Sequence, residues 1–139
     1  MNWYRVPRIE EGVAHVEITG TIGYSQQTAE TLLADVAHAE SIELHLDTDG
    51  GCSKTAFDLV AGFGQRVHRA IVRGRCGSAG IFLLLTAAVR ECFPESRFMV
   101  HSAQGACLGG VGQIKAEIET LERINRRQLE MIVDRTGQE

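Results

Sequence analysis

Three short parts of this sequence carry residue types that together can perform acyl transfer: a serine, a histidine and a pair of glycines. Ser78 lies among small residues just before an apolar run, where a helix is expected to begin. His101 follows the β-type run 97–100 and can serve as a general base. Gly50 and Gly51 form an open turn after an apolar run. Hydrolysis of an acyl bond by serine needs a nucleophile, a base and donors for the oxyanion.

The backbone on either side of Ser78 offers the oxyanion donors. A helix that begins behind Ser78 directs free N–H groups and a partial positive charge toward it. The N–H of Ala79 is therefore one candidate donor, and the N–H of Gly51 is the second. Each part also has an ordinary structural role: a serine before a helix is usually an N-cap, a glycine pair is usually a tight turn, and a histidine after a strand is usually structural. Residue types alone leave both interpretations open.

Alternating strands and helices are predicted to position these residues. Apolar and polar residues alternate, or β-type residues gather, over the predicted strands 12–23, 42–46, 70–74 and one or two within 91–101. Helical spacing of apolar residues predicts helices over 28–40, 53–70, 78–90 and 112–137, with Gly137 as the last stop signal. This order indicates an α/β fold, whose sites gather where the strands end.

Composition narrows the class of protein. The chain has 139 residues, of which 44% are hydrophobic and 23% charged, so we expect one domain with a real core. A net charge of -4 without a basic stripe argues against a nucleic-acid partner. The N-terminus is not a signal peptide, and no apolar run approaches the roughly 20 residues of a membrane span. We therefore expect a cytoplasmic protein that does not enter a membrane, and residues Trp3 and Tyr4 to be loosely packed or to form an interface contact.

Other reactive residues receive structural interpretations. The four cysteines lack C-x-x-C spacing and are expected to be reduced and mostly buried, with Cys76 packed in a turn rather than acting as a nucleophile. No metal-ligand spacing links the histidines at positions 15, 38, 45 and 68, so no metal site is expected. The glycines at 105, 109, 110 and 112 lack the lysine of a phosphate-binding loop. No cofactor is therefore expected.

Four segments resemble, in order, the proteolytic subunit of the Clp protease, a family of serine peptidases. These segments are LHLDTDGG, GRCGSAGIFLLLTAA, FPESRFMVHSA and the run from GGVGQIKAEIE to DRTG. The resemblance extends from about Val13 to Gly137, and its first part is similar to ClpP-like head-maturation proteases of phages and prophages. It implies a ClpP/crotonase-like spiral of β-β-α units with a long C-terminal handle helix.

The resemblance also implies roles for particular residues. It makes Ser78 the nucleophile, His101 the base, and the N–H groups of Gly51 and Ala79 the oxyanion donors. Residues 105–112 match the strand that pairs with substrate backbone, which makes Gly109 and Gly110 substrate-binding residues. The implied substrates are peptides or unfolded proteins. The implied partners are further copies in a homo-oligomeric ring, and an AAA+ ATPase or phage capsid proteins.

The sequence departs from the family pattern at three places. Asp49 stands where the family has proline, and Gly77 replaces the usual alanine before Ser78. The family's catalytic aspartate lies beyond the handle helix, so residues 1–139 are expected to be a single ClpP-like domain truncated after that helix. Asp47 or Asp49 is an alternative third member, whereas Asp134 lies too far along the handle helix.

Three functions remain open at this point. The first is a ClpP-like serine endopeptidase that works through an acyl-enzyme on Ser78. The second is a catalytically impaired ring or scaffold subunit of the same fold. The third is a crotonase-type acyl-CoA enzyme, which uses two backbone N–H groups on a thioester enolate but needs a carboxylate base in place of the Ser78 and His101 pair.

Overall fold

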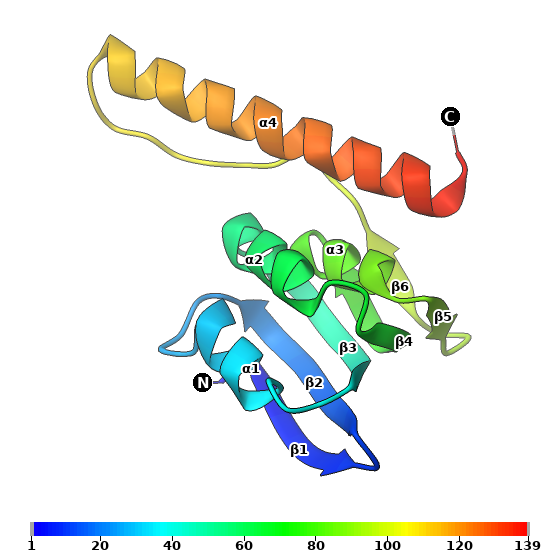
Figure 1. Cartoon of the computed structure of the whole chain (residues 1–139). Helices are drawn as coiled ribbons and strands as arrows, with labels where there is room; N and C mark the ends of the chain where they lie inside the picture. Colours follow the sequence, from blue (N-terminus) through cyan, green and yellow to red (C-terminus); the bar gives the residue numbers. More distant parts are fainter. Residues whose placement is uncertain (1, 139) are drawn as a thin grey trace. The chain divides into compact units, whose positions relative to one another are not determined.

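A computed structural model describes residues 2–138, which divide into two compact units, the first ending at Val100 and the second beginning at His101 (Figure 1). The first unit contains the strands β1 (Tyr4–Glu10), β2 (Val13–Ile22), β3 (Ser41–Gly51), β4 (Val67–Gly77), β5 (Val89–Cys92) and β6 (Arg97–Met99). Its helices are α1 (Ala29–Asp35), α2 (Ser53–Phe63) and α3 (Ala79–Thr86). The second unit contains the helix α4 (Val111–Thr136).

The strands of the first unit form one mixed sheet in the order β1-β2-β3-β4-β5, with β6 also paired to β4. Only β1 runs antiparallel to its neighbour β2, and the remaining pairs are parallel. β5 pairs with residues 69–72 of β4, whereas β6 pairs with residues 75–77 of the same strand. Because parallel strands end at one edge of a sheet, Gly51 of β3 and Gly77 of β4 finish at the same edge. The predicted α/β fold with a long C-terminal helix is confirmed.

The core lies between the sheet and the three helices of the first unit, which lie on one face of it (Figure 1). Alternate side chains of the central strands are completely buried there: Val16, Ile18, Leu44, Leu46, Ala70 and Val72. Phe57 of α2 stacks on Phe82 of α3 with ring centroids 4.5 Å apart. Residues 79–85 of α3 are all buried, as the continuous apolar run predicted.

Several predicted ends of helices and strands were wrong, because a glycine or the pairing of neighbouring strands sets where these elements end. The helix predicted over 53–70 ends at Phe63, where Gly64 adopts a φ of +56°, and Val67 begins β4. The strand predicted over 42–46 continues to Gly51, so the glycine pair forms the end of β3. α1 and α3 also end earlier than predicted.

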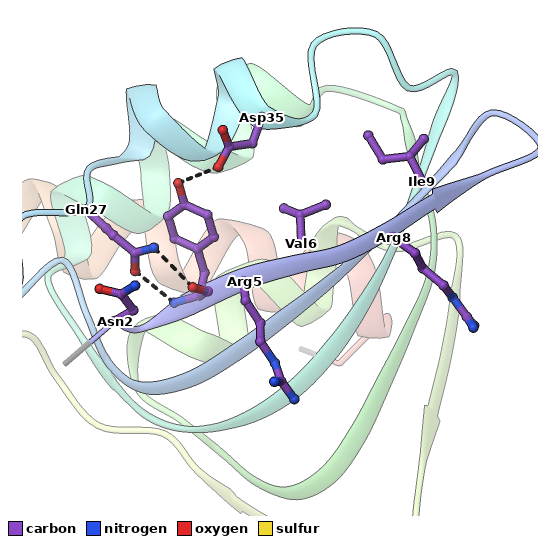
Figure 2. A pocket seen from close by; sticks show the side chains of 8 residues that line it. Asn2, Arg5, Val6, Arg8, Ile9, Gln27 and Asp35 are labelled. Atoms are coloured by element: carbon purple, nitrogen blue, oxygen red, sulfur yellow. Dashed lines mark hydrogen bonds between the residues drawn. The ribbon is translucent and has the colours of Figure 1, made fainter.

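The N-terminus is packed, which corrects the expectation of a loose terminus. Trp3 and Tyr4 are only 2% and 5% exposed. The Gln27 side chain accepts hydrogen bonds from both of their backbone N–H groups. The Tyr4 hydroxyl donates to Asp35 Oδ2 at 2.8 Å (Figure 2). An open hollow of about 440 Å³ lies beside these contacts between β1 and α1 (Figure 2). Its lining includes Arg5 and Asp35.

The four cysteines are free thiols, but the expectation that most are buried was wrong. Cys76 is buried at the end of β4 and Cys52 is partly buried. Cys92 and Cys107 are exposed: Cys92 is the last residue of the edge strand β5, and Cys107 lies in the irregular segment before α4.

The second unit consists of residues 101–110 without regular secondary structure, followed by α4. α4 ends as predicted at Gly137, which has a left-handed φ of +69° and donates its N–H to the Val133 carbonyl at 2.9 Å. Within residues 2–138, no helix is both long and apolar enough to cross a membrane.

Candidate active site

Ser78 occupies a sharp turn between the end of β4 and the start of α3. Its φ of +49° and ψ of −119° lie in a region that residues with a side chain rarely adopt. The Ser78 N–H donates to the Met99 carbonyl at 2.7 Å, and its carbonyl accepts from Ile81 at 3.0 Å. A strained serine in a strand–turn–helix junction is the geometry that presents a hydroxyl as a nucleophile.

The hydroxyl of Ser78 does not cap α3, although Ser78 occupies the N-cap position. Among the described residues, no side chain makes the capping hydrogen bond to the first turn of this helix. Ala79 is the first residue of α3, and its N–H lies at the positive end of the helix dipole. The Ser78 hydroxyl does not neutralise this partial charge by capping. The interpretation of Ser78 as an ordinary N-cap loses its main support.

Gly50 lies directly against the Ser78 turn. A Cβ placed on Gly50 would come within 2.6 Å of Ser78 Cβ and 2.7 Å of the Gly77 carbonyl oxygen. The φ of +108° at Gly50 also favours glycine. Glycine is therefore needed here because of a close approach between the end of β3 and the serine turn.

Thr48 fixes the direction of the glycine pair. Its buried hydroxyl donates to the Gly20 carbonyl and accepts from the Gly50 N–H at 3.0 Å. The Cys52 N–H, which follows the glycine pair, donates to the Ile22 carbonyl at 2.8 Å. Hydrogen bonds therefore hold the backbone on both sides of Gly51.

The two aspartates near the glycine pair are both engaged by Arg75. Asp49 Oδ2 lies 2.8 Å from the Arg75 guanidinium, and its side chain is 65% exposed. Asp47 Oδ1 accepts the Arg75 backbone N–H at 2.9 Å. Arg75 thus offsets the extra negative charge that Asp49 brings to the turn.

His101 opens the second unit and is held by α4. Gln128 of α4 donates to the His101 carbonyl at 3.2 Å, and Asn125 accepts the Ala103 N–H at 2.6 Å. His101 Nδ1 lies 2.6 Å from the Ser102 carbonyl oxygen. Because a carbonyl oxygen only accepts, this hydrogen bond places the proton on Nδ1 and leaves the Nε2 lone pair as the basic atom.

The glycine-containing segment before α4 is not a strand in this structure, contrary to the pattern implied for residues 105–112. Residues 105–110 are exposed and irregular, and Val111 already belongs to α4. Gly109 precedes Gly110, which is the N-cap of α4 and donates its N–H to Gln113 Oε1 at 2.7 Å.

The first unit therefore brings together three of the predicted site residues: Ser78, Ala79 and Gly51. The other three, His101, Gly109 and Gly110, belong to the second unit. Burial raises the pKa of the neighbouring Cys76 thiol to about 12, so this cysteine is a poor nucleophile, as expected.

Sequence reasoning missed a cluster on the polar face of the sheet. His15 of β2 and the β3 residues Glu43 and His45 place one ligand atom each within 4.8 Å of one another. Spacing along the chain could not reveal this group, because its members come from two strands. The available signal was the i, i+2 spacing of Glu43 and His45 on one face of a predicted strand.

The fold and the Ser78 turn define an α/β protein with a serine at a strand–turn–helix junction beside a glycine-rich strand end. Residues 15–139 match the Clp protease family, and the chain belongs to this family. It is 28% identical over 121 residues to the ATP-dependent Clp protease proteolytic subunit 3 of Rhizobium etli. That alignment covers 82% of this chain and 61% of the relative, so the chain spans less than two thirds of the relative's length.

Proposed function

We propose that this protein is a serine endopeptidase that cleaves peptide bonds through an acyl-enzyme on Ser78. The observation that carries this proposal is the strained backbone of Ser78, with Gly50 packed against it and no capping role for its hydroxyl among the described residues. A buried N-cap serine does not require a φ of +49°, whereas a nucleophile aimed out of a strand–turn–helix junction does. Membership in the Clp protease family supports the same activity.

In the proposed reaction, Ser78 Oγ attacks the carbonyl carbon of the peptide bond while His101 Nε2 takes its proton. The N–H groups of Gly51 and Ala79 hold the oxyanion that forms. The amine then leaves with the proton from His101, and an ester remains on Ser78. Water attacks this ester with His101 again acting as base, which releases the acid and restores the serine.

The tautomer of its imidazole supports His101 as the base. The hydrogen bond from Nδ1 to the Ser102 carbonyl favours the tautomer that a base needs.

We propose that residues 1–139 form a single ClpP-like domain. A catalytically impaired ring or scaffold subunit is the outcome if no turnover is found.

Substrates, assembly and location follow from family membership and remain part of this proposal. Peptides or unfolded proteins would pair with residues near Gly109 and Gly110 through main-chain hydrogen bonds. A homo-oligomeric ring is supported by apolar side chains exposed along α4: Val111, Ile114, Ile118, Leu129 and Val133. An AAA+ ATPase or capsid proteins would supply substrates. Free thiols fit a cytoplasmic location.

The proposal is tested by hydrolysis of a fluorogenic peptide and of an unfolded protein by the full chain. Ser78→Ala and His101→Ala should each lower the rate to background, because they remove the nucleophile and its base. Ser96→Ala is the matched control: the Ser96 hydroxyl donates to the Val72 carbonyl, and its loss should leave the rate unchanged. Hydrolysis that survives Ser78→Ala would contradict the proposal.

A further inference from the structure

The cluster on the polar face of the sheet has the donor set of a transition-metal site. Glu43 Oε1 lies 3.3 Å from His15 Nδ1 and 2.8 Å from His45 Nε2. Donors of a tetrahedral ion with bonds of about 2.0–2.1 Å lie about 3.3 Å apart. The two distances from Glu43 Oε1 are therefore already close to the separation that a bound ion would impose.

Sheet register explains why these side chains meet. His15 of β2 is directly paired with Glu43 of β3, and His45 lies two residues further along β3 on the same face. The neighbouring residues Val16 and Leu44 point to the opposite face and anchor both strands in the core. The ligand atoms are thus carried by rigid strands rather than by loops.

Burial and an unsatisfied atom distinguish this cluster from a solvated surface group. Glu43 and His45 are each 9% exposed. Within residues 2–138, His15 Nδ1 is buried without a hydrogen-bond partner, even though Glu43 lies within reach. A buried imidazole nitrogen that faces a carboxylate without a hydrogen bond is what a metal ligand looks like before the ion binds.

An entry path and a favourable charge are also present. A shallow pocket of about 560 Å³ opens beside the cluster and is lined by Glu10, Glu11, Val13, His15, Glu43 and His68. Its three carboxylates attract cations. Arg69 lies 3.4 Å from Glu43 Oε2 but is also paired with Glu91 at 2.6 Å, which balances its charge.

We propose that His15 Nδ1, Glu43 Oε1 and His45 Nε2 bind one Zn²⁺ ion at the pocket. Two imidazoles and one carboxylate are the donors that Zn²⁺ accepts, and they leave the fourth position for water. Glu43 precedes Gly50 by about 23 Å along β3, at about 3.3 Å per residue. The ion therefore ties β2 to β3 away from Ser78, and this inference does not depend on the proposed peptidase activity.

Binding requires one rearrangement of a proton. Arg73 Nε donates to His45 Nδ1 at 3.1 Å, so His45 carries its proton on Nε2, where it donates to Glu43. Coordination through Nε2 moves that proton to Nδ1, and the exposed Arg73 side chain turns into solvent. Arg73 thus opposes binding, and its removal should strengthen it.

The test uses the untagged full chain, with Zn²⁺ titrated by calorimetry and Co²⁺ monitored by its visible bands. We expect one ion per chain, tetrahedral Co²⁺ bands, and a rise in Tm with Zn²⁺. His15→Ala and Glu43→Gln should each weaken the Kd by about tenfold or more and abolish the rise in Tm. Arg73→Gln should tighten the Kd.

His38→Ala is the matched control, because His38 is an exposed histidine outside the cluster, and its Kd should equal that of the unmodified chain. Circular dichroism establishes that each variant is folded, and the near-isosteric Glu43→Gln covers the case in which His15→Ala does not fold. The proposal is overturned if the unmodified chain binds no Zn²⁺, or if a folded Glu43→Gln binds it equally well.

Discussion

At the scale of single residues, backbone conformation separates the two roles that the sequence left open for Ser78. The residue type and its small neighbours fit a helix cap as well as a nucleophile. The φ of +49° and the missing cap bond in the described chain are consequences of how β4 meets α3, which no local pattern reports. The location of Ser78 was therefore predictable, whereas its strain was not.

Burial predicts different reactivities for the four thiols. At pH 8 the Cys76 thiol, with a pKa of about 12, has only about one part in 10⁴ as thiolate, and no reagent can approach it. Iodoacetamide should therefore modify the exposed Cys92 readily and Cys76 only after unfolding in urea, as peptide mapping would reveal. Equal labelling rates at both positions in the folded protein would contradict this assignment.

The same burial sets a stability trend with pH. The unfolded Cys76 thiol ionises near pH 9, whereas the folded thiol stays protonated to about pH 12. The folded state then holds more protons than the unfolded state between these values. The contribution of Cys76 to stability is consequently full below pH 9 and is lost as the pH rises above it.

At the scale of elements, alternation and helical spacing predicted the order of strands and helices, but not where each one ends. Gly64 ends α2 because a left-handed φ suits glycine, and Val67 then pairs with Ile42 of β3. Such long-range pairing overrides the local helical pattern. Trp3 was misjudged for the same reason, since its burial depends on contacts with distant Gln27.

The contact between the end of β3 and the serine turn predicts how substitution of Gly50 affects stability. Gly50→Ala should lower the free energy of unfolding by about 3 kcal/mol and sharply reduce any hydrolysis, because the new Cβ would press on Ser78 and Gly77. Gly20→Ala is the matched control: Gly20 has a φ of +71° but no atom within 4 Å of its Cβ, so only about 1 kcal/mol should be lost.

Urea denaturation of the unmodified chain and of both variants measures how much free energy of unfolding each substitution removes. If Gly50→Ala lowers the free energy of unfolding by no more than Gly20→Ala does, only the positive φ requires glycine at position 50. The close approach to Ser78 would then be incorrect.

At the scale of the whole molecule, the sequence contained enough to identify the family, because Ser78, His101 and the glycine pair occur in a specific order over most of the chain. It did not reveal the group formed by His15, Glu43 and His45, since convergence across two strands depends on register. Nor did it reveal the irregular form of residues 105–110.

Covalent labelling with a fluorophosphonate probe reports whether the hydroxyl of Ser78 is activated. This reagent reacts with serines whose hydroxyl has been activated by a base and an oxyanion hole, even when turnover is slow. We expect one adduct per chain, mapped to Ser78, and its loss in both Ser78→Ala and His101→Ala. Absence of labelling in the folded full chain, or an adduct on another serine that persists in Ser78→Ala, would contradict it.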